Sequence, residues 1–280
     1  LQQKFGPHRV MDTPIAEEGM TGIAIGAALN GLYPIMTHIR ADFSILAMNQ
    51  IVNLAAKYKY MSGGEFQTPL LIRAVIGRSW GQGAQHSQSF QSLFSHIPGL
   101  TVIMPSEPSA ILSSYAYATE KFKGPVISFE HRLMYDLNFN IKSGEAKKTG
   151  NPFTSRLVRK GKHVTIVATS IMVLEAQRAA AHLSQFGIQC EVIDLNCISA
   201  PNHKLIFDSV KKTGKLLVAD SSWIPFGVCA EVNRIICERD PRVLKSPVVN
   251  VGMAFAPCPT AKSLEDIFYP NLRTLSESIA

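Results

Sequence analysis

Several common signatures are missing from this 280-residue sequence, and their absence excludes whole classes of protein. None of the five cysteines forms a CxxC pair, so we expect no structural zinc site and no other metal held by this chain alone. An odd number of such thiols fits a reducing compartment, either the cytoplasm or an organelle matrix. The longest apolar stretch, residues 22–36, is interrupted by Gly, Asn and Pro and is shorter than the ~20 residues of a membrane span. Neither GxxxxGK[ST] nor a strand-linked GxGxxG occurs, which argues against a classical nucleotide site.

A basic stripe is also missing, although the formal net charge is +7. Residues 1–150 hold 13 basic and 10 acidic residues, and residues 151–280 hold 15 and 11. The excess of 3 plus 4 is therefore spread evenly along the chain. Nucleic-acid binding needs a concentrated basic surface, so we expect neither a nucleic acid nor a membrane as a partner.

Short apolar runs alternate with helical patterns in the first half of the sequence. Strands followed by helices of this length are typical of a parallel sheet with helices on its faces. Strands are expected at 34–38, 69–76, 100–104 and 125–129, and helices at 17–30, 43–58 and 108–121.

The alternation stops at residues 138–155, which are polar and rich in Gly, Lys and Asn, as in a linker. The sequence thus predicts an α/β protein of two domains, 1–137 and 156–280, each a mostly parallel sheet flanked by helices. In the second domain we expect strands at 163–169, 189–195, 215–219 and 247–251, and helices at 172–186, 203–212 and 227–238.

Four polar segments stand out against this background. They are DTPIAEEG at 12–19, ADFS at 41–44, YMSGG at 60–64 and GAQHSQ at 83–88. In order and spacing they resemble the β subunit of the first component of 2-oxoacid dehydrogenase complexes, a transketolase-like family that uses thiamine diphosphate. The resemblance is strongest from residue 9 to residue 135.

The resemblance implies a shared active site. In this family the diphosphate and its magnesium ion are held by a GDG motif of an α subunit, and this sequence contains no GDG. We therefore expect this chain to bind the pyrimidine half of the cofactor and to act with an α subunit, as an α2β2 heterotetramer.

The resemblance also assigns roles to residues. Glu17 matches the glutamate that exchanges a proton with the pyrimidine ring, and His86 matches a catalytic histidine. Phe43 and Leu46 are expected beside the cofactor, with Phe43 stacked on the ring. From the residues alone, Glu17 could equally favour the helix dipole, Phe43 could be a core residue, and His86 could bond the loop backbone.

Three further residues are expected near the substrate. Arg40 and His38 stand where the family usually has apolar or small residues, and Arg78 lies in the loop before His86, near Trp80. A guanidinium could bind a carboxylate or a phosphate of the substrate through two hydrogen bonds. The alternative for Arg40 is an ordinary surface arginine in a loop.

The chain departs from the family at three places. About 45 residues normally precede the position of Leu1, and Lys121 and Lys123 stand where many relatives bind a monovalent cation. We expect a lysine to replace that ion, because two ammonium groups would repel it. Lys245 reverses the charge of an aspartate that helps relatives to dock the lipoyl acyltransferase, which leaves that partner uncertain.

The expected activity is decarboxylation of a 2-oxoacid with transfer of the acyl or aldehyde fragment. The alternatives are a free-standing transketolase-like carboligase subunit, or a non-catalytic scaffold, against which Glu17 and His86 argue.

Overall fold

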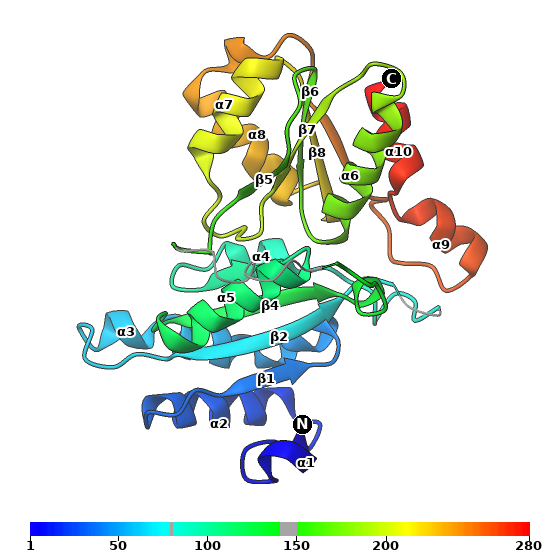
Figure 1. Ribbon diagram of the computed structural model, residues 1–280. Coiled ribbons are helices and arrows are strands. Elements are labelled where there is room, and N and C mark those ends of the chain that lie inside the picture. The colour runs from blue at the N-terminus through cyan, green and yellow to red at the C-terminus, as the bar shows by residue number, and fades with distance from the viewer. Residues whose placement is uncertain (79–80, 141–149) are drawn as a thin grey trace.

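The computed structural model describes residues 1–78, 81–140 and 150–280, and shows two α/β domains stacked on each other (Figure 1). The predicted α/β architecture with two mostly parallel sheets is confirmed. The expected linker at 138–155 lies partly outside the described residues, since 141–149 are not among them.

The first sheet has the strand order β1-β2-β4-β3, and all of its described pairs are parallel. Its central strand β2 is buried on both faces, which explains its near-continuous apolar sequence LLIRAVI. Because the strands are parallel, β1, β2 and β4 end at one edge, where His38 is level with Ala74, and Ile76 with His131. The strands are β1 (Ile35–His38), β2 (Leu70–Ile76), β3 (Thr101–Ile103) and β4 (Pro125–His131).

Helices cover both faces of this sheet. Figure 1 shows α4 and α5 between the sheet and the second domain, and α2 on the far side. The helical segments are α1 (Gln2–Phe5), α2 (Glu17–Leu29), η1 (Ala41–Ala47), η2 (Asn49–Ala55), α3 (Tyr58–Met61), α4 (Gln91–Ser95), α5 (Pro108–Glu120) and η3 (Arg132–Met134).

The prediction of one continuous helix at 43–58 is wrong, because the segment changes its helix type along its length. The segment starts as the 3₁₀ helix η1, continues as the π helix η2, and ends before the separate short helix α3. Apolar spacing predicts which residues face the core, but not which carbonyl each amide bonds. Here the first turn is tied to a distant loop through Asp42, whose carboxylate accepts two hydrogen bonds from Gln88. Irregular turns of this kind are frequent beside functional sites.

The second sheet has the order β5-β7-β6-β8-β9 and is parallel except for β5. The sequence did not predict β5, α4 or the last two helices, which are short or follow no long apolar run. The strands are β5 (Arg156–Arg159), β6 (Val164–Ala168), β7 (Cys190–Asp194), β8 (Leu216–Trp223) and β9 (Val249–Met253). The helices are α6 (Ile171–Ser184), α7 (His203–Thr213), α8 (Val228–Arg239), η5 (Pro241–Val243), α9 (Lys262–Phe268) and α10 (Leu272–Ile279).

Buried contacts join the two domains. One apolar cluster contains residues of both, among them Phe94 of the first domain and Phe207 of the second. The side chain of Gln91 donates to the buried carboxylate of Asp220 at 3.0 Å. No helix in the described ranges is both long and apolar enough to cross a bilayer.

Candidate active site

A cavity of about 350 Å³ lies at the edge of the first sheet where β1, β2 and β4 end. Five of the residues singled out from the sequence line it together. They come from the start of α2, the end of β1, the first turn of η1 and the loop after β2: Glu17, His38, Arg40, Phe43 and His86. Residues nearly 70 positions apart in the sequence thus line the same cavity.

Glu17 is the first residue of α2 and is partly exposed in the cavity. The preceding residue, Ala16, has no side chain that could cap the helix, so the first-turn carboxylates are the groups that favour this helix end. The carboxyl group of Glu17 hydrogen-bonds to no other described residue. A carboxyl group of this kind can form a hydrogen bond to a molecule in the cavity.

His38 lines the same cavity as Glu17 and is buried. Burial lowers the pKa of His38, and the nearby charge of Glu17 opposes that effect. Its Nε2 is 3.3 Å from the hydroxyl of Thr21, while its Nδ1 is buried without a partner among the described residues. His38 is therefore a neutral side chain with one free hydrogen-bonding position beside the Glu17 carboxyl group.

Arg40 is only 5% exposed, so the alternative of an ordinary surface arginine is wrong. Its Nη2 donates to the carbonyl oxygen of Gly77 at 2.5 Å and also to that of His86. Burial lowers the pKa of Arg40, and the neighbouring Asp42 opposes this, with 3.9 Å between Arg40 Nε and Asp42 Oδ2. The guanidinium thus links the end of β2 to the loop that carries His86.

His86 packs its ring edge-on against Phe43. The ring centroids are 5.2 Å apart and the ring planes meet at 74°. This contact and the bond to Arg40 fix His86 from two sides. An aromatic side chain and a histidine are therefore packed together in the lining of the cavity that Glu17 also lines.

The second domain also holds this loop in place. Gly83 has φ +68°, and a Cβ atom on it would stand 2.6 Å from the hydroxyl oxygen of Thr260. Arg78 donates to the carboxylate of Asp266 at 3.2 Å and lies over the ring of Tyr269, 5.3 Å from its centroid. Residues beyond β9 therefore support the loop, although they do not line the cavity.

Two of the expected site residues do not line the cavity. Leu46 is 58% exposed on the outer side of η1, and Arg78 turns to the second domain. Trp80 lies outside the described residues. Two buried residues had no role predicted from the sequence: Asp42, which binds the loop through Gln88, and His131. His131 could have been noticed as a histidine at the end of a buried strand, one position after the buried Glu130.

His131 explains a glycine in the site. A Cβ atom on Gly77, which has φ +82°, would come within 2.2 Å of the His131 ring. Burial, helped by the charges of Arg78 and Arg40, lowers the pKa of His131 to about 3. The ring is therefore neutral and packs directly under the backbone that Arg40 binds.

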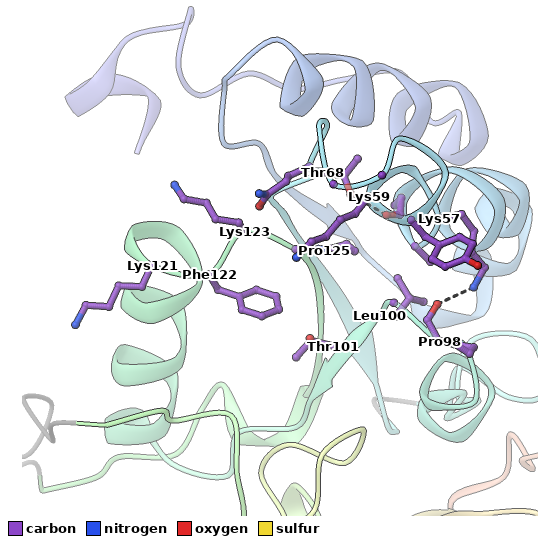
Figure 2. Close-up of a pocket in the computed structure, with 18 residues that line it drawn as sticks. Lys57, Lys59, Thr68, Pro98, Leu100, Thr101, Lys121, Phe122, Lys123 and Pro125 are labelled. Atoms are coloured by element: carbon purple, nitrogen blue, oxygen red, sulfur yellow. Dashed lines mark hydrogen bonds between the residues drawn. The ribbon is translucent and has the colours of Figure 1, made fainter.

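A larger hollow of about 1250 Å³ lies at the opposite edge of the first sheet, where the strands begin (Figure 2). Lys121 and Lys123, which were expected to replace a bound cation, lie on its rim, and both are exposed. In Figure 2 they reach outward on either side of Phe122. Neither ammonium group hydrogen-bonds to another described residue, so the replacement of an ion by a lysine stays a prediction. No group of three or more potential metal-binding side chains occurs in the described ranges.

Comparisons with known proteins agree with this architecture. The family described as "Transketolase, pyrimidine binding domain" matches residues 1–137, and "Transketolase, C-terminal domain" matches residues 154–275. The chain is 40% identical to the mitochondrial pyruvate dehydrogenase E1 component subunit beta of Bos taurus, covering 98% of this chain and 77% of that protein. It is 36% identical to the corresponding subunit of Rickettsia conorii, covering 100% and 85%.

A solved structure described as a split-gene transketolase, inactive beta4 tetramer, has the same fold. Its TM-score is 0.80 at 24% identity, and the match covers 99% of this chain and 85% of that one. The fold and the cavity thus define an enzyme subunit of the transketolase type. The chain belongs to the β subunits of thiamine-diphosphate-dependent 2-oxoacid dehydrogenases, within the transketolase-like family.

Membership of this family implies thiamine diphosphate as the cofactor. The described residues fit its pyrimidine half. Glu17 offers a carboxyl group without a protein partner, and Phe43 offers an aromatic face in the same cavity. His38 Nδ1 is a second buried polar atom without a partner beside them.

Proposed function

We propose that this chain is the pyrimidine-binding subunit of an enzyme that decarboxylates a 2-oxoacid and passes the acyl fragment to an acceptor. The observation that carries the proposal is the convergence of Glu17, Phe43 and His86 on one cavity from three separate segments. Family membership gives this convergence its chemical meaning.

Each of these side chains has a proposed task. Bound thiamine diphosphate supplies the nucleophilic carbon and the electron sink for decarboxylation. Glu17 holds and exchanges a proton at the pyrimidine ring, and Phe43 fixes the plane of that ring. His86 exchanges a proton with the substrate oxygen, a role that suits a histidine near neutral pH. Leu46 stays a proposed cofactor contact, although it lies outside the cavity in this chain alone.

Arg40 and His38 complete the proposed site. Arg40 holds the backbone of the His86 loop, so its main task is to position that histidine. His38 limits water beside Glu17, because its ring is buried and neutral. Arg78 was expected near the substrate, and its ion pair with Asp266 gives it instead a proposed task in fixing the loop.

The rest of the cofactor needs a second polypeptide. We propose an α subunit that binds the diphosphate and magnesium, in an α2β2 heterotetramer located in the cytoplasm or an organelle matrix. The domains are proposed to divide at residues 138–155. The exposed Lys245 lies against Gly214 in the second domain, where its charge would oppose docking of the usual lipoyl acyltransferase.

The test is co-expression with the α subunit, followed by a panel of 2-oxoacids. Release of CO₂ from at least one 2-oxoacid, only when both subunits are present, is expected. Reductive acylation of a lipoyl domain then decides whether the acceptor is the lipoyl group. An assembled pair that releases no CO₂ from any 2-oxoacid would contradict the proposal.

A further inference from the structure

The hollow at the starting edge of the first sheet has no part in the site described above. Its floor is Pro98, Leu100 and Thr101 at the start of β3, and one wall is residues 121–125 before β4. The opposite wall is the segment from Ala55 to Thr68, which includes α3. Since the parallel strands begin here and end at the catalytic cavity, the two sites lie at opposite edges of one sheet.

The lining of this hollow has charge of one sign. None of the described residues that line it is acidic. Four lysines line it, two from each wall: Lys57, Lys59, Lys121 and Lys123. Lys57 donates to the carbonyl oxygen of Pro98 at 2.6 Å, as the dashed line in Figure 2 shows. The other three ammonium groups have no hydrogen-bond partner in the described ranges. Clustered, unpaired positive charge attracts a negatively charged ligand.

The remaining lining is apolar, and the apolar surface continues outside the hollow. Phe122 turns its ring inward in Figure 2. Tyr60 on the opposite wall is 89% exposed, and Met61 and Phe66 of the same segment are also exposed. A small anion would cover none of these three side chains, whereas a polypeptide could cover them together.

Two more observations favour a polypeptide. The volume of about 1250 Å³ exceeds the ~300–1,000 Å³ of pockets for small molecules. The side-chain oxygen of Gln67, which lines the hollow, is buried and has no partner among the described residues. It can accept a hydrogen bond from a backbone N–H group, which a peptide has and a simple carboxylate or phosphate lacks.

We propose that this lysine hollow docks an acidic segment of the α subunit, one that carries apolar side chains between its carboxylates. This inference rests on the proposed function, which requires an α subunit. Carboxylates would meet the lysines on both walls, while apolar side chains would cover Phe122 and Tyr60. The contact would join the subunits at the edge of the sheet away from the chemistry.

The test compares two triple variants of the β chain, each co-expressed with the α subunit. K59E/K121E/K123E reverses three lysines of the hollow, and Lys57 is kept because it supports Pro98. The matched control, K160E/K162E/K211E, makes the same change of charge on exposed lysines of the second domain. Association is measured by sedimentation at several salt concentrations, after circular dichroism has shown that both variants are folded.

We expect the hollow variant to bind the α subunit at least about tenfold more weakly than wild type, with a flatter salt dependence. The control should stay within about twofold of wild type. Equal binding by the hollow variant overturns the inference, as does equal weakening in the control. A wild-type chain that binds no α subunit contradicts the proposed function itself, so the two failures are distinct.

Discussion

The two edges of the first sheet carry charge in opposite ways. At the edge where strands end, Arg40 and Asp42 are both buried beside each other, and each is bonded to the loop of His86. At the edge where strands begin, lysines line a hollow whose described lining has no acidic residue, and Lys59, Lys121 and Lys123 are exposed. Buried, paired charges hold a fixed geometry, whereas exposed unpaired charges are free to meet a partner.

This contrast separates chemistry from assembly. Several polar atoms at the catalytic edge are buried without a hydrogen-bond partner in the described chain, including His38 Nδ1, Arg40 Nε and Asp42 Oδ2, although the last two are 3.9 Å apart as an ion pair. Such atoms are costly unless a ligand or a rearrangement satisfies them. Among the described residues that line the hollow, one atom is comparable, the side-chain oxygen of Gln67. The lining of the catalytic cavity thus holds more unsatisfied groups than the lining of the hollow does.

The largest expected effect is that of Glu17→Gln. Glutamine keeps the shape of Glu17 but cannot exchange a proton at the pyrimidine ring, so kcat should fall by about 10²–10⁴-fold. The affinity of the assembled enzyme for thiamine diphosphate, measured by calorimetry, should change by less than about tenfold. Deuterium exchange at the thiazolium carbon should slow in parallel with kcat.

Glu18→Gln is the matched control for this change. Glu18 is the next residue of α2 and is exposed, with its carboxylate 3.1 Å from the side-chain nitrogen of Gln50. Its replacement should leave kcat within about twofold, since surface substitutions of this kind are mild. Equal losses in the two variants, or unchanged exchange in Glu17→Gln, would remove the role given to Glu17.

A smaller effect is expected for Arg40→Met, which tests whether the catalytic edge is held in place by buried charge. Losing the bonds to Gly77 and His86 should let the loop move, and a displacement of about 1 Å can cost on the order of 10²-fold in rate. Arg40→Lys should recover part of kcat. A fall in kcat with little change in KM is expected, because the guanidinium binds the loop and not the substrate.

Arg242→Met serves as the control for Arg40→Met. Arg242 is exposed and pairs with Asp240 in the second domain, far from β1 in the sequence. It should leave kcat unchanged. If instead Arg40→Met raises KM for the 2-oxoacid with kcat intact, Arg40 binds the substrate carboxylate, as the sequence first indicated.

The order of strands and helices could be predicted well because alternating apolar runs depend on local sequence. The strand at Leu70–Ile76, expected at 69–76, shows this. The antiparallel strand Arg156–Arg159 could not be predicted, because it has a polar sequence and is held by pairing with β7. Pairing partners are set by tertiary structure, which one short segment does not encode.

The candidate site was predictable to a similar extent. The order and spacing of the motifs predicted that Glu17, Phe43 and His86 share one site, and all three line one cavity. It did not show that Arg40 faces a backbone carbonyl, because a charged residue after a strand is usually exposed. Nor did it show the lysine hollow, whose lysines come from two segments about 60 residues apart. Long-range packing decides both features.

The last expected effect is on stability and not on rate, and it concerns His131, the neutral histidine beneath Gly77. Its pKa is about 3 in the folded protein, against an ordinary value of 6.5. Between these values the unfolded chain binds a proton that the folded chain does not. The free energy of unfolding should therefore fall as the pH is lowered from 6.5 toward 3, by up to about 1.4 kcal/mol per pH unit from this group.

His131→Asn should remove that part of the slope, while His8→Asn, at an exposed position, should not. Urea denaturation at pH 4.5 to 7 measures the difference. If the free energy of unfolding changed with pH in the same way for wild type and His131→Asn, the catalytic edge would not keep this histidine neutral. The buried charges of that edge would then be less firmly held than the comparison of the two edges requires.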